Sequence, residues 1–166
     1  MKPSLYLTAA ALVLLISGGV YLNASAYSAA PPSTFVLLDG SKKESSSLKG
    51  KVTLVNFWAT SCVTCVAEMP NLLTTYDQYK VRGYDTIAVA MRYDSPTYVA
   101  NFAQTRKLSF DVAIDSSGEV AKAWGDVQLT PTSYLVNKRG EIVKRYVGEP
   151  DLPELHHLIE QLLAEV

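Results

Sequence analysis

The chain has 166 residues, and its 15 Lys and Arg against 16 Asp and Glu give a formal charge of −1 at pH 7. This balance excludes the dense positive field that nucleic-acid binding needs, so no nucleic-acid partner is expected. With 48% hydrophobic and 19% charged residues, the composition indicates a globular protein and excludes a disordered one. Two cysteines are too few for a disulfide-stapled mini-protein, which favours a chemical role for Cys62 and Cys65.

Residues 1–26 have the features of a targeting or anchoring segment. Lys2 supplies a positive charge, and the 18 residues from Leu5 to Leu22 contain no Asp, Glu, Lys, Arg or His. That length favours a membrane anchor, whereas the Ala24-Ser25-Ala26 sequence that follows is typical of a signal-peptidase cleavage site. Both alternatives stay open. In either case the remainder is exported, because Lys2 is retained inside.

Residues 27–33 predict a linker, because small residues and the Pro31-Pro32 pair favour an extended chain. One domain then covers residues 34–166. It is expected to begin with a hairpin formed by Thr34–Leu38 and Ser45–Leu48, with turn residues at Asp39-Gly40.

Strands and helices alternate through the rest of the domain. Val52–Trp58 and Tyr84–Met91 are too apolar for half-exposed strands and predict strands buried on both faces of a sheet. Further strands are expected at Phe110–Ile114, Thr132–Asn137 and Glu141–Val147, and helices at about Val63–Val81, Pro96–Lys107, Glu119–Trp124 and Leu152–Ala164. A βαβ half followed by ββα predicts a three-layer α/β sandwich with a mixed sheet.

The decisive motif is a C-x-x-C pair, Cys62-Val63-Thr64-Cys65, placed where a buried strand ends and a helix begins. The free N–H groups and positive dipole at a helix N-terminus favour a thiolate on Cys62. The i, i+3 spacing places Cys65 one turn later on the same face, within reach of a disulfide. We therefore expect a redox pair in which Cys62 attacks and the more enclosed Cys65 resolves.

The two cysteines could also have other roles. A structural disulfide would close a very short loop, where the stabilisation is smallest. A zinc site needs more ligands, and the neighbouring His156 and His157 point in different directions on a helix. A Cu(I) site made of two thiolates remains an alternative, because soft metals prefer sulfur ligands.

From about Phe35 to Ala164 the chain resembles the thioredoxin-like family of TlpA/ResA type, which are exported thiol-disulfide oxidoreductases that include cytochrome c maturation reductases. The matching segments are Ser47–Lys51, Leu54–Thr60, Cys62-x-x-Cys65-x-x-Glu68-Met69-Pro70, Asp115–Glu119, Ala121–Gly125 and Thr130–Val136. The resemblance implies a thioredoxin-like fold with an N-terminal hairpin extension. It also implies a bacterial cell-envelope location, with the domain tethered to the inner membrane or, after cleavage following Ala26, free in the periplasm.

The resemblance also assigns residues to the site. It implies a cis peptide bond at Pro131, where Thr130 and Thr132 offer backbone groups to a bound substrate strand, and we count Trp58 with them as substrate-binding. Glu68 matches the family's active-site acid. Its i+3 position after Cys65 suits it to take the proton when Cys65 must ionise.

Two positions depart from the family pattern. Ser61 replaces the Trp that most members carry before the first cysteine, so we expect a smaller and more polar docking surface, and the choice of partner does not carry over. Val63-Thr64 replaces the usual dipeptide between the cysteines, so the reduction potential does not carry over.

The expected activity is that of a monomeric disulfide reductase acting on protein cysteines without a bound cofactor. The resemblance implies a membrane electron donor, and apocytochrome c or a copper-site protein as the client. A Cu(I)-delivery protein, a thiol oxidase and a peroxidase are the alternatives. Tyr93 and Tyr98 are candidates for lining a substrate groove, whereas packing explains Met69 better than metal binding.

Overall fold

The computed structural model describes residues 27–165. The predicted signal peptide or anchor at residues 1–26 lies outside the described residues. Among the helices of residues 27–165, none is both long enough and apolar enough to cross a membrane.

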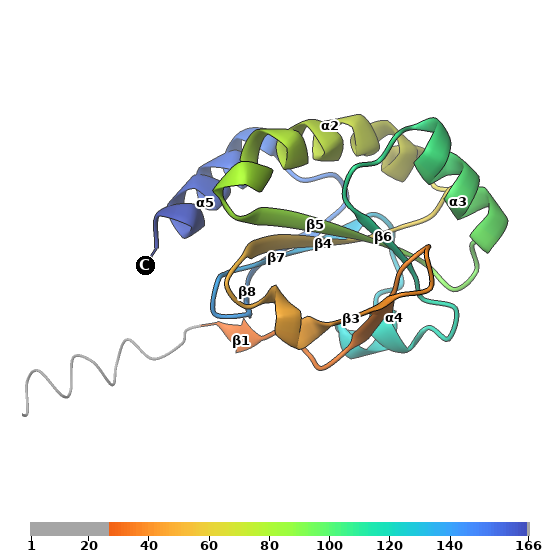
Figure 1. The fold of residues 1–166 in the computed structure, drawn as a ribbon, viewed down its shortest axis with the longest axis horizontal. Coiled ribbons are helices and arrows are strands. Elements are labelled where there is room, and N and C mark those ends of the chain that lie inside the picture. Colours follow the sequence, from red (N-terminus) through yellow and green to blue (C-terminus); the bar gives the residue numbers. More distant parts are fainter. Residues whose placement is uncertain (1–26, 166) are drawn as a thin grey trace, which may run out of the picture.

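A six-stranded mixed sheet forms the middle layer (Figure 1), in the order β1-β8-β7-β4-β5-β6. The strands are β1 (Ser28–Ala29), β4 (Val52–Trp58), β5 (Tyr84–Ala90), β6 (Asp111–Ile114), β7 (Thr132–Val136) and β8 (Glu141–Val147). Strands β4, β5 and β6 are parallel, while β7, β8 and β1 pair antiparallel. Every residue of β4, β5 and β7 is buried, which is the burial expected of central strands covered on both faces.

Helices cover both faces of this sheet. One face carries α2 (Val63–Tyr79), α3 (Pro96–Thr105) and α5 (Leu152–Ala164). The other carries α4 (Glu119–Ala123), the 3-10 helix η1 (Ser45–Leu48) and the hairpin of β2 (Thr34–Val36) and β3 (Lys42–Glu44). A further 3-10 turn, η2 (Lys80–Arg82), follows α2. The predicted three-layer sandwich, mixed sheet and hairpin extension are therefore confirmed.

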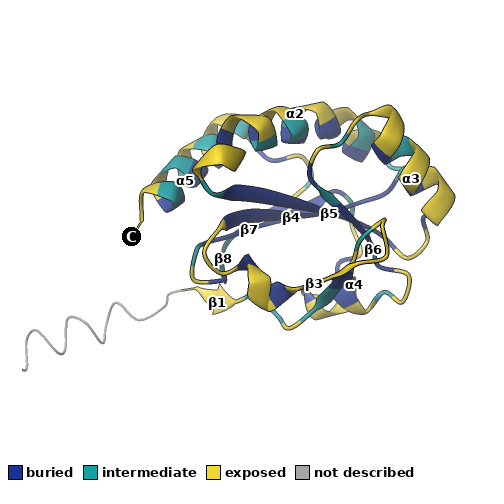
Figure 2. Ribbon diagram, in the orientation of Figure 1, coloured by how far each residue is buried: buried dark blue, intermediate teal, exposed yellow. Residues whose placement is uncertain are grey.

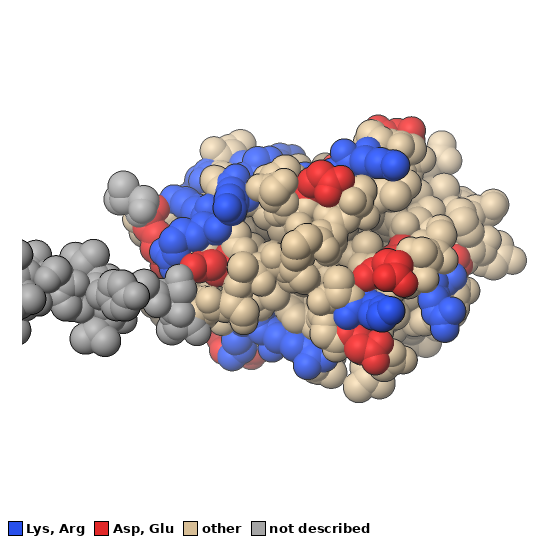
Figure 3. Space-filling view, turned by 90° about the horizontal axis from the view of Figure 1, so that it is seen from below, with Lys and Arg blue, Asp and Glu red and all other residues tan. Residues whose placement is uncertain are grey.

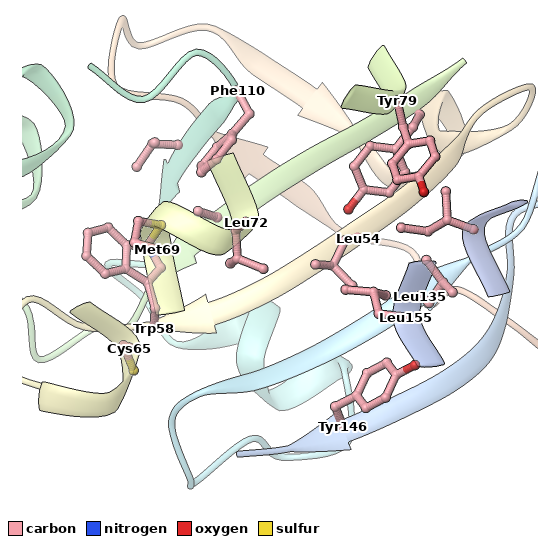
Figure 4. Close-up of a cluster of buried hydrophobic side chains, with 14 of the residues drawn as sticks. Leu54, Trp58, Cys65, Met69, Leu72, Tyr79, Phe110, Leu135, Tyr146 and Leu155 are labelled. Atoms are coloured by element: carbon pink, nitrogen blue, oxygen red, sulfur yellow. The ribbon is translucent and has the colours of Figure 1, made fainter. Parts of the chain in front are cut away.

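Each interface between layers has its own apolar core, and the buried side of every helix faces the sheet (Figure 2). On the α2 face, Leu54, Leu72 and Leu155 are at most 1% exposed and belong to a cluster that also includes Trp58 and Cys65 (Figure 4). Cys65 is thus part of the apolar core.

The hairpin prediction was wrong in its second strand. Ser45–Leu48 forms η1, and the strand that pairs with β2 is Lys42–Glu44. Gly40, at φ 82°, donates its N–H to Leu37 O, and Leu37 N–H donates to Ser41 O, so the chain reverses over few residues. The second strand of the hairpin therefore begins at Lys42, closer to the turn than the apolar pattern predicted.

A further expectation needs correction. Part of the expected linker, Ser28–Ala29, pairs with Ile142 and Glu141 of β8, because an edge strand offers unpaired backbone groups to an extended neighbour.

The surface carries charges of both signs. On the face that Figure 3 shows, basic and acidic side chains are interspersed on a surface that is otherwise uncharged. This distribution agrees with the net charge of −1.

Candidate active site

Cys62 lies in the turn between β4 and α2. It is the N-cap residue of α2, and its N–H donates to Ala59 O at 3.1 Å. Its Sγ accepts the N–H of Cys65 at 3.2 Å, so the sulfur occupies the place that a capping oxygen takes in other helices. One of the free N–H groups at the helix start therefore points at the sulfur that is predicted to become a thiolate.

The two sulfurs form a disulfide, and their surroundings differ. The bond joins residues three positions apart, with Cα atoms separated by 5.2 Å. Cys62 is partly exposed, whereas Cys65 is 0% exposed. A partner can therefore reach Cys62 but not Cys65, as the expected division between attacking and resolving cysteine requires.

A cis-proline segment faces the disulfide. The Thr130-Pro131 bond is cis, and Thr130 O lies 3.5 Å from Cys62 Sγ. Pro131 O accepts the N–H of Gly148 at 2.8 Å, which ties this segment to the end of β8. The sequence-based expectation of a cis bond beside the cysteines is confirmed.

Of the four residues expected to bind substrate, the structure leaves only Thr130 partly exposed. Pro131 is buried, and Thr132 is 0% exposed with its hydroxyl donating to Leu129 O at 2.8 Å. Trp58 is also 0% exposed, and its ring packs on Phe102 with centroids 5.1 Å apart. Trp58 is therefore a core residue that supports the site from beneath, and its expected contact with substrate is corrected.

Glu68 lies on the buried side of α2 and is 0% exposed. Its Oε1 accepts a 2.9 Å hydrogen bond from Asn56 Nδ2, which also donates to Ser133 Oγ at 2.9 Å. Burial raises the pKa of Glu68 to about 7, although the Asn56 hydrogen bond acts in the opposite direction, and the charge of Glu149 adds to the rise. A carboxyl with this pKa can accept or release a proton near neutral pH.

Four exposed side chains, Val63, Tyr93, Leu129 and Val147, lie next to Cys62 in the chain or next to the cis-proline segment and are here called the apolar rim. Their exposed fractions are 83%, 59%, 66% and 55%. Val63 follows Cys62, Leu129 precedes Thr130, Tyr93 has its hydroxyl 3.4 Å from Thr130 Oγ1, and Val147 is the β8 partner of Thr132. Exposed apolar side chains on the segments that flank a reactive group favour contact with a polypeptide partner.

The loop between β5 and α3 contains Tyr93, which the sequence offered as a candidate, and Asp94, which it did not. The Asp94 carboxylate accepts hydrogen bonds from Thr60 in the turn before Cys62. The available signal was its place at the carboxyl end of a central parallel strand, where the sites of α/β sheets gather. Tyr98 is 67% exposed on α3, and Met69 is 1% exposed and packed in the core, as expected.

Residues 27–165 contain no group of three or more His, Cys, Asp or Glu side chains arranged to hold a metal ion. His156 bonds instead to Thr75 Oγ1 at 2.9 Å.

The chain matches the Redoxin family model over residues 25–160. It is 36% identical to the thiol-disulfide oxidoreductase ResA of Bacillus thuringiensis subsp. konkukian over 125 residues, which are 75% of this chain and 71% of the relative. Identity to ResA of Bacillus subtilis is 37% over 116 residues, or 69% of this chain and 64% of the relative.

Solved structures agree with this match. A solution structure from Neisseria meningitidis has a TM-score of 0.76 and 40% identity, covering 81% of this chain and 90% of that one. The crystal structure of StoA from Bacillus subtilis has a TM-score of 0.66 and 26% identity, covering 77% of this chain and 96% of that one.

Proposed function

Because the chain belongs to the Redoxin family and is a thiol-disulfide oxidoreductase of the TlpA/ResA type, we propose that it is an exported reductase of disulfides in other proteins. One observation carries the proposal: Cys62 is accessible at a helix N-terminus, whereas Cys65 is enclosed on the same helix as a buried acid, Glu68. This asymmetry supports an ordered exchange in two steps, with a different cysteine acting in each.

In the first step the Cys62 thiolate attacks a client disulfide. A bond forms between Cys62 Sγ and one client sulfur, and the other client sulfur leaves as a thiolate that takes a proton from solvent. The N–H of Cys65, 3.2 Å from Cys62 Sγ, stabilises the attacking thiolate. The client chain then lies beside Thr130, whose backbone oxygen is 3.5 Å from Cys62 Sγ.

In the second step Cys65 releases the client. Glu68 accepts the thiol proton of Cys65, and the resulting thiolate attacks Cys62 Sγ. The intramolecular disulfide closes, and the second client sulfur leaves as a thiolate that takes a proton from solvent. The client has gained two electrons and the Cys62/Cys65 pair has lost two. A pKa of about 7 makes Glu68 a suitable proton acceptor at neutral pH, and burial is the main reason for that value.

The client is proposed to be a polypeptide with cysteines, such as apocytochrome c or a copper-site protein. The apolar rim favours a polypeptide client over a small charged thiol. Burial of the exposed Leu129 and Val147 side chains under apolar groups of a client would lower the free energy of the complex. An exported reductase must be re-reduced in an oxidising compartment, so a membrane electron donor is part of the proposal.

The direction of electron flow is tested by the reduction potential of the Cys62/Cys65 couple. The full-length protein in detergent is equilibrated in thiol/disulfide buffers, and the oxidised fraction is measured by thiol trapping. A value below about −230 mV supports the reductase, whereas a value near about −120 mV identifies an oxidant of client thiols.

Export is tested by fusing a periplasm-active reporter to the C-terminus of the full chain. Loss of reporter activity on deleting residues 1–26 supports export, and unchanged activity contradicts it.

A further inference from the structure

We propose that Asp94 is a positioning residue for the redox reaction, which fixes the turn that presents Cys62. Its Oδ2 accepts the N–H of Thr60 at 2.5 Å, and its Oδ1 accepts the Thr60 hydroxyl at 2.6 Å. Asp94 lies in the loop after β5, 34 positions from Thr60 in the chain. One carboxylate thus holds both donors of a residue two positions before the attacking cysteine.

The surroundings of Asp94 explain why this contact is strong. Asp94 is 8% exposed, and no Lys, Arg or His within residues 27–165 forms an ion pair with it. A carboxylate removed from water costs several kcal/mol unless donors compensate it. The two Thr60 donors supply that compensation through short, charge-assisted hydrogen bonds.

Backbone hydrogen bonds fix the loop to the sheet, so the position of Asp94 is itself well defined. Asp94 N–H donates to Met91 O at 2.9 Å, and Met91 N–H donates to Trp58 O at 3.0 Å. Tyr93, the preceding residue, places its hydroxyl 3.4 Å from Thr130 Oγ1. The same loop therefore contacts the turn before Cys62 and the cis-proline segment opposite it.

The position of Thr60 determines that of Cys62 Sγ. Ala59, next to Thr60, accepts the Cys62 N–H at 3.1 Å, and this short turn places Cys62 as the N-cap of α2. Loosening the turn at Thr60 releases Sγ from the Cys65 N–H that it accepts at 3.2 Å. Without that donor the thiolate of Cys62 is less stable.

The inference rests on the proposed attacking role of Cys62, and its test separates position from charge. Asparagine at 94 keeps the shape of the side chain: its amide oxygen accepts the Thr60 N–H, and its amide nitrogen donates to the Thr60 hydroxyl. Alanine removes both hydrogen bonds as well as the charge. Removal of a nearby negative charge by itself stabilises a thiolate, so a charge effect and a positioning effect have opposite signs.

The experiment measures the pH dependence of Cys62 alkylation by iodoacetamide in the full-length Cys65→Ser protein. We expect Asp94→Ala to raise the pKa of Cys62 by about one pH unit, and so to lower the alkylation rate at neutral pH about tenfold, the size of a lost capping contact. Asp94→Asn stays within about threefold of the parent rate. Asp39→Ala removes an exposed aspartate from the hairpin and is the matched control, with an unchanged profile.

A pair of milder variants keeps the test decisive if Asp94→Ala fails to fold. Thr60→Val removes only the hydroxyl contact and should raise the pKa of Cys62 by a smaller amount, whereas Thr60→Ser restores the parent profile. A lower pKa in both Asp94 variants would overturn positioning in favour of a charge effect. Unchanged profiles in Asp94→Ala and Thr60→Val overturn it as well. Failure of the attacking role itself is recognised separately, as exchange activity that survives Cys62→Ser.

Discussion

Asn56 Nδ2 donates to Glu68 Oε1 at 2.9 Å, and both side chains are 0% exposed. The bond joins the middle of β4 to the buried side of α2. Because Asn56 is neutral, it orients the carboxyl without holding it ionised as a cation would, and burial dominates the pKa of Glu68.

The two cysteines should give different mutant behaviour. Cys62→Ser is expected to abolish reduction of insulin disulfides, because the remaining Cys65 is buried. Cys65→Ser is expected to accumulate a mixed disulfide with the client, since nothing then resolves it. Non-reducing electrophoresis and mass spectrometry identify the adduct. Full activity of Cys62→Ser would contradict the assignment of the attacking thiol.

Glu68→Gln should slow the resolving step more than the attack. The amide cannot accept the Cys65 proton, so we expect the second step to slow by about 10²-fold near pH 7, while the first step changes little. Rapid-quench measurements of mixed-disulfide formation and decay separate the two rates. Asn56→Asp is a useful comparison, because it replaces the hydrogen-bond donor of Glu68 with a second carboxyl group. Equal slowing of both steps by Glu68→Gln would remove its proton role.

The stability of the oxidised protein should depend on pH through Glu68. Its pKa is raised from 4.5 to about 7, mainly by burial. Between these values the folded chain holds a proton that the unfolded chain has lost, so the free energy of unfolding falls as pH rises. The total loss is at most about 3 kcal/mol. Urea unfolding at several pH values checks this, and the slope should flatten in Glu68→Gln; an equal slope in both proteins contradicts the assignment.

The apolar rim should matter for protein clients only. Leu129 is 66% exposed beside Thr130, and replacing it with serine removes apolar area that a bound chain would cover. We expect Leu129→Ser to raise the KM for a protein disulfide about tenfold, with no change for a small aromatic disulfide. Val81→Ser, at an 85% exposed position in η2, is the matched control. A similar rise in the control would remove the rim from client binding.

Asp85 should stabilise the fold without affecting the redox site. It accepts Lys43 Nζ at 3.1 Å and Lys51 Nζ at 3.0 Å, and ties β3 to the start of β5. Burial opposes its ionisation, but the two lysines outweigh that effect and hold its pKa below the usual value. Its contribution is therefore present above the unfolded-state pKa of 3.8 and is lost as pH falls through the folded-state pKa.

Asp85→Asn is expected to lower the free energy of unfolding at pH 7 by about 2 kcal/mol. This loss is smaller than the loss expected on breaking a fully buried ion pair, because Lys43 Nζ still pairs with Asp111 Oδ2 at 2.9 Å. Urea unfolding measures the loss, and the reduction potential should stay unchanged. Asp77→Asn, which breaks the exposed pair with Lys80, is the control and should have no measurable effect. A shift in potential would place Asp85 in the redox mechanism.

Local sequence patterns are enough to predict most of the helices and strands and the reactive pair. For β8 and α5 the predicted bounds are those of the structure, Glu141–Val147 and Leu152–Ala164. The C-x-x-C motif at a strand-to-helix junction located Cys62 and Cys65, because thiolate stabilisation at a helix N-terminus involves only neighbouring residues. Signals of this kind are contained within a few positions of the chain.

The packing of the elements against one another fixes which of these side chains face solvent and which residues far apart in the chain meet. The i+3 spacing of Glu68 fits an exposed carboxylate as well as a buried one, and the packing of α2 on β4 selects the latter. Trp58 matched a substrate-binding position but is covered by Phe102 of α3. Asp94 meets Thr60 because β5 lies beside β4 in the sheet order. Burial and long-range contacts depend on how separate elements pack, and no local pattern contains that information.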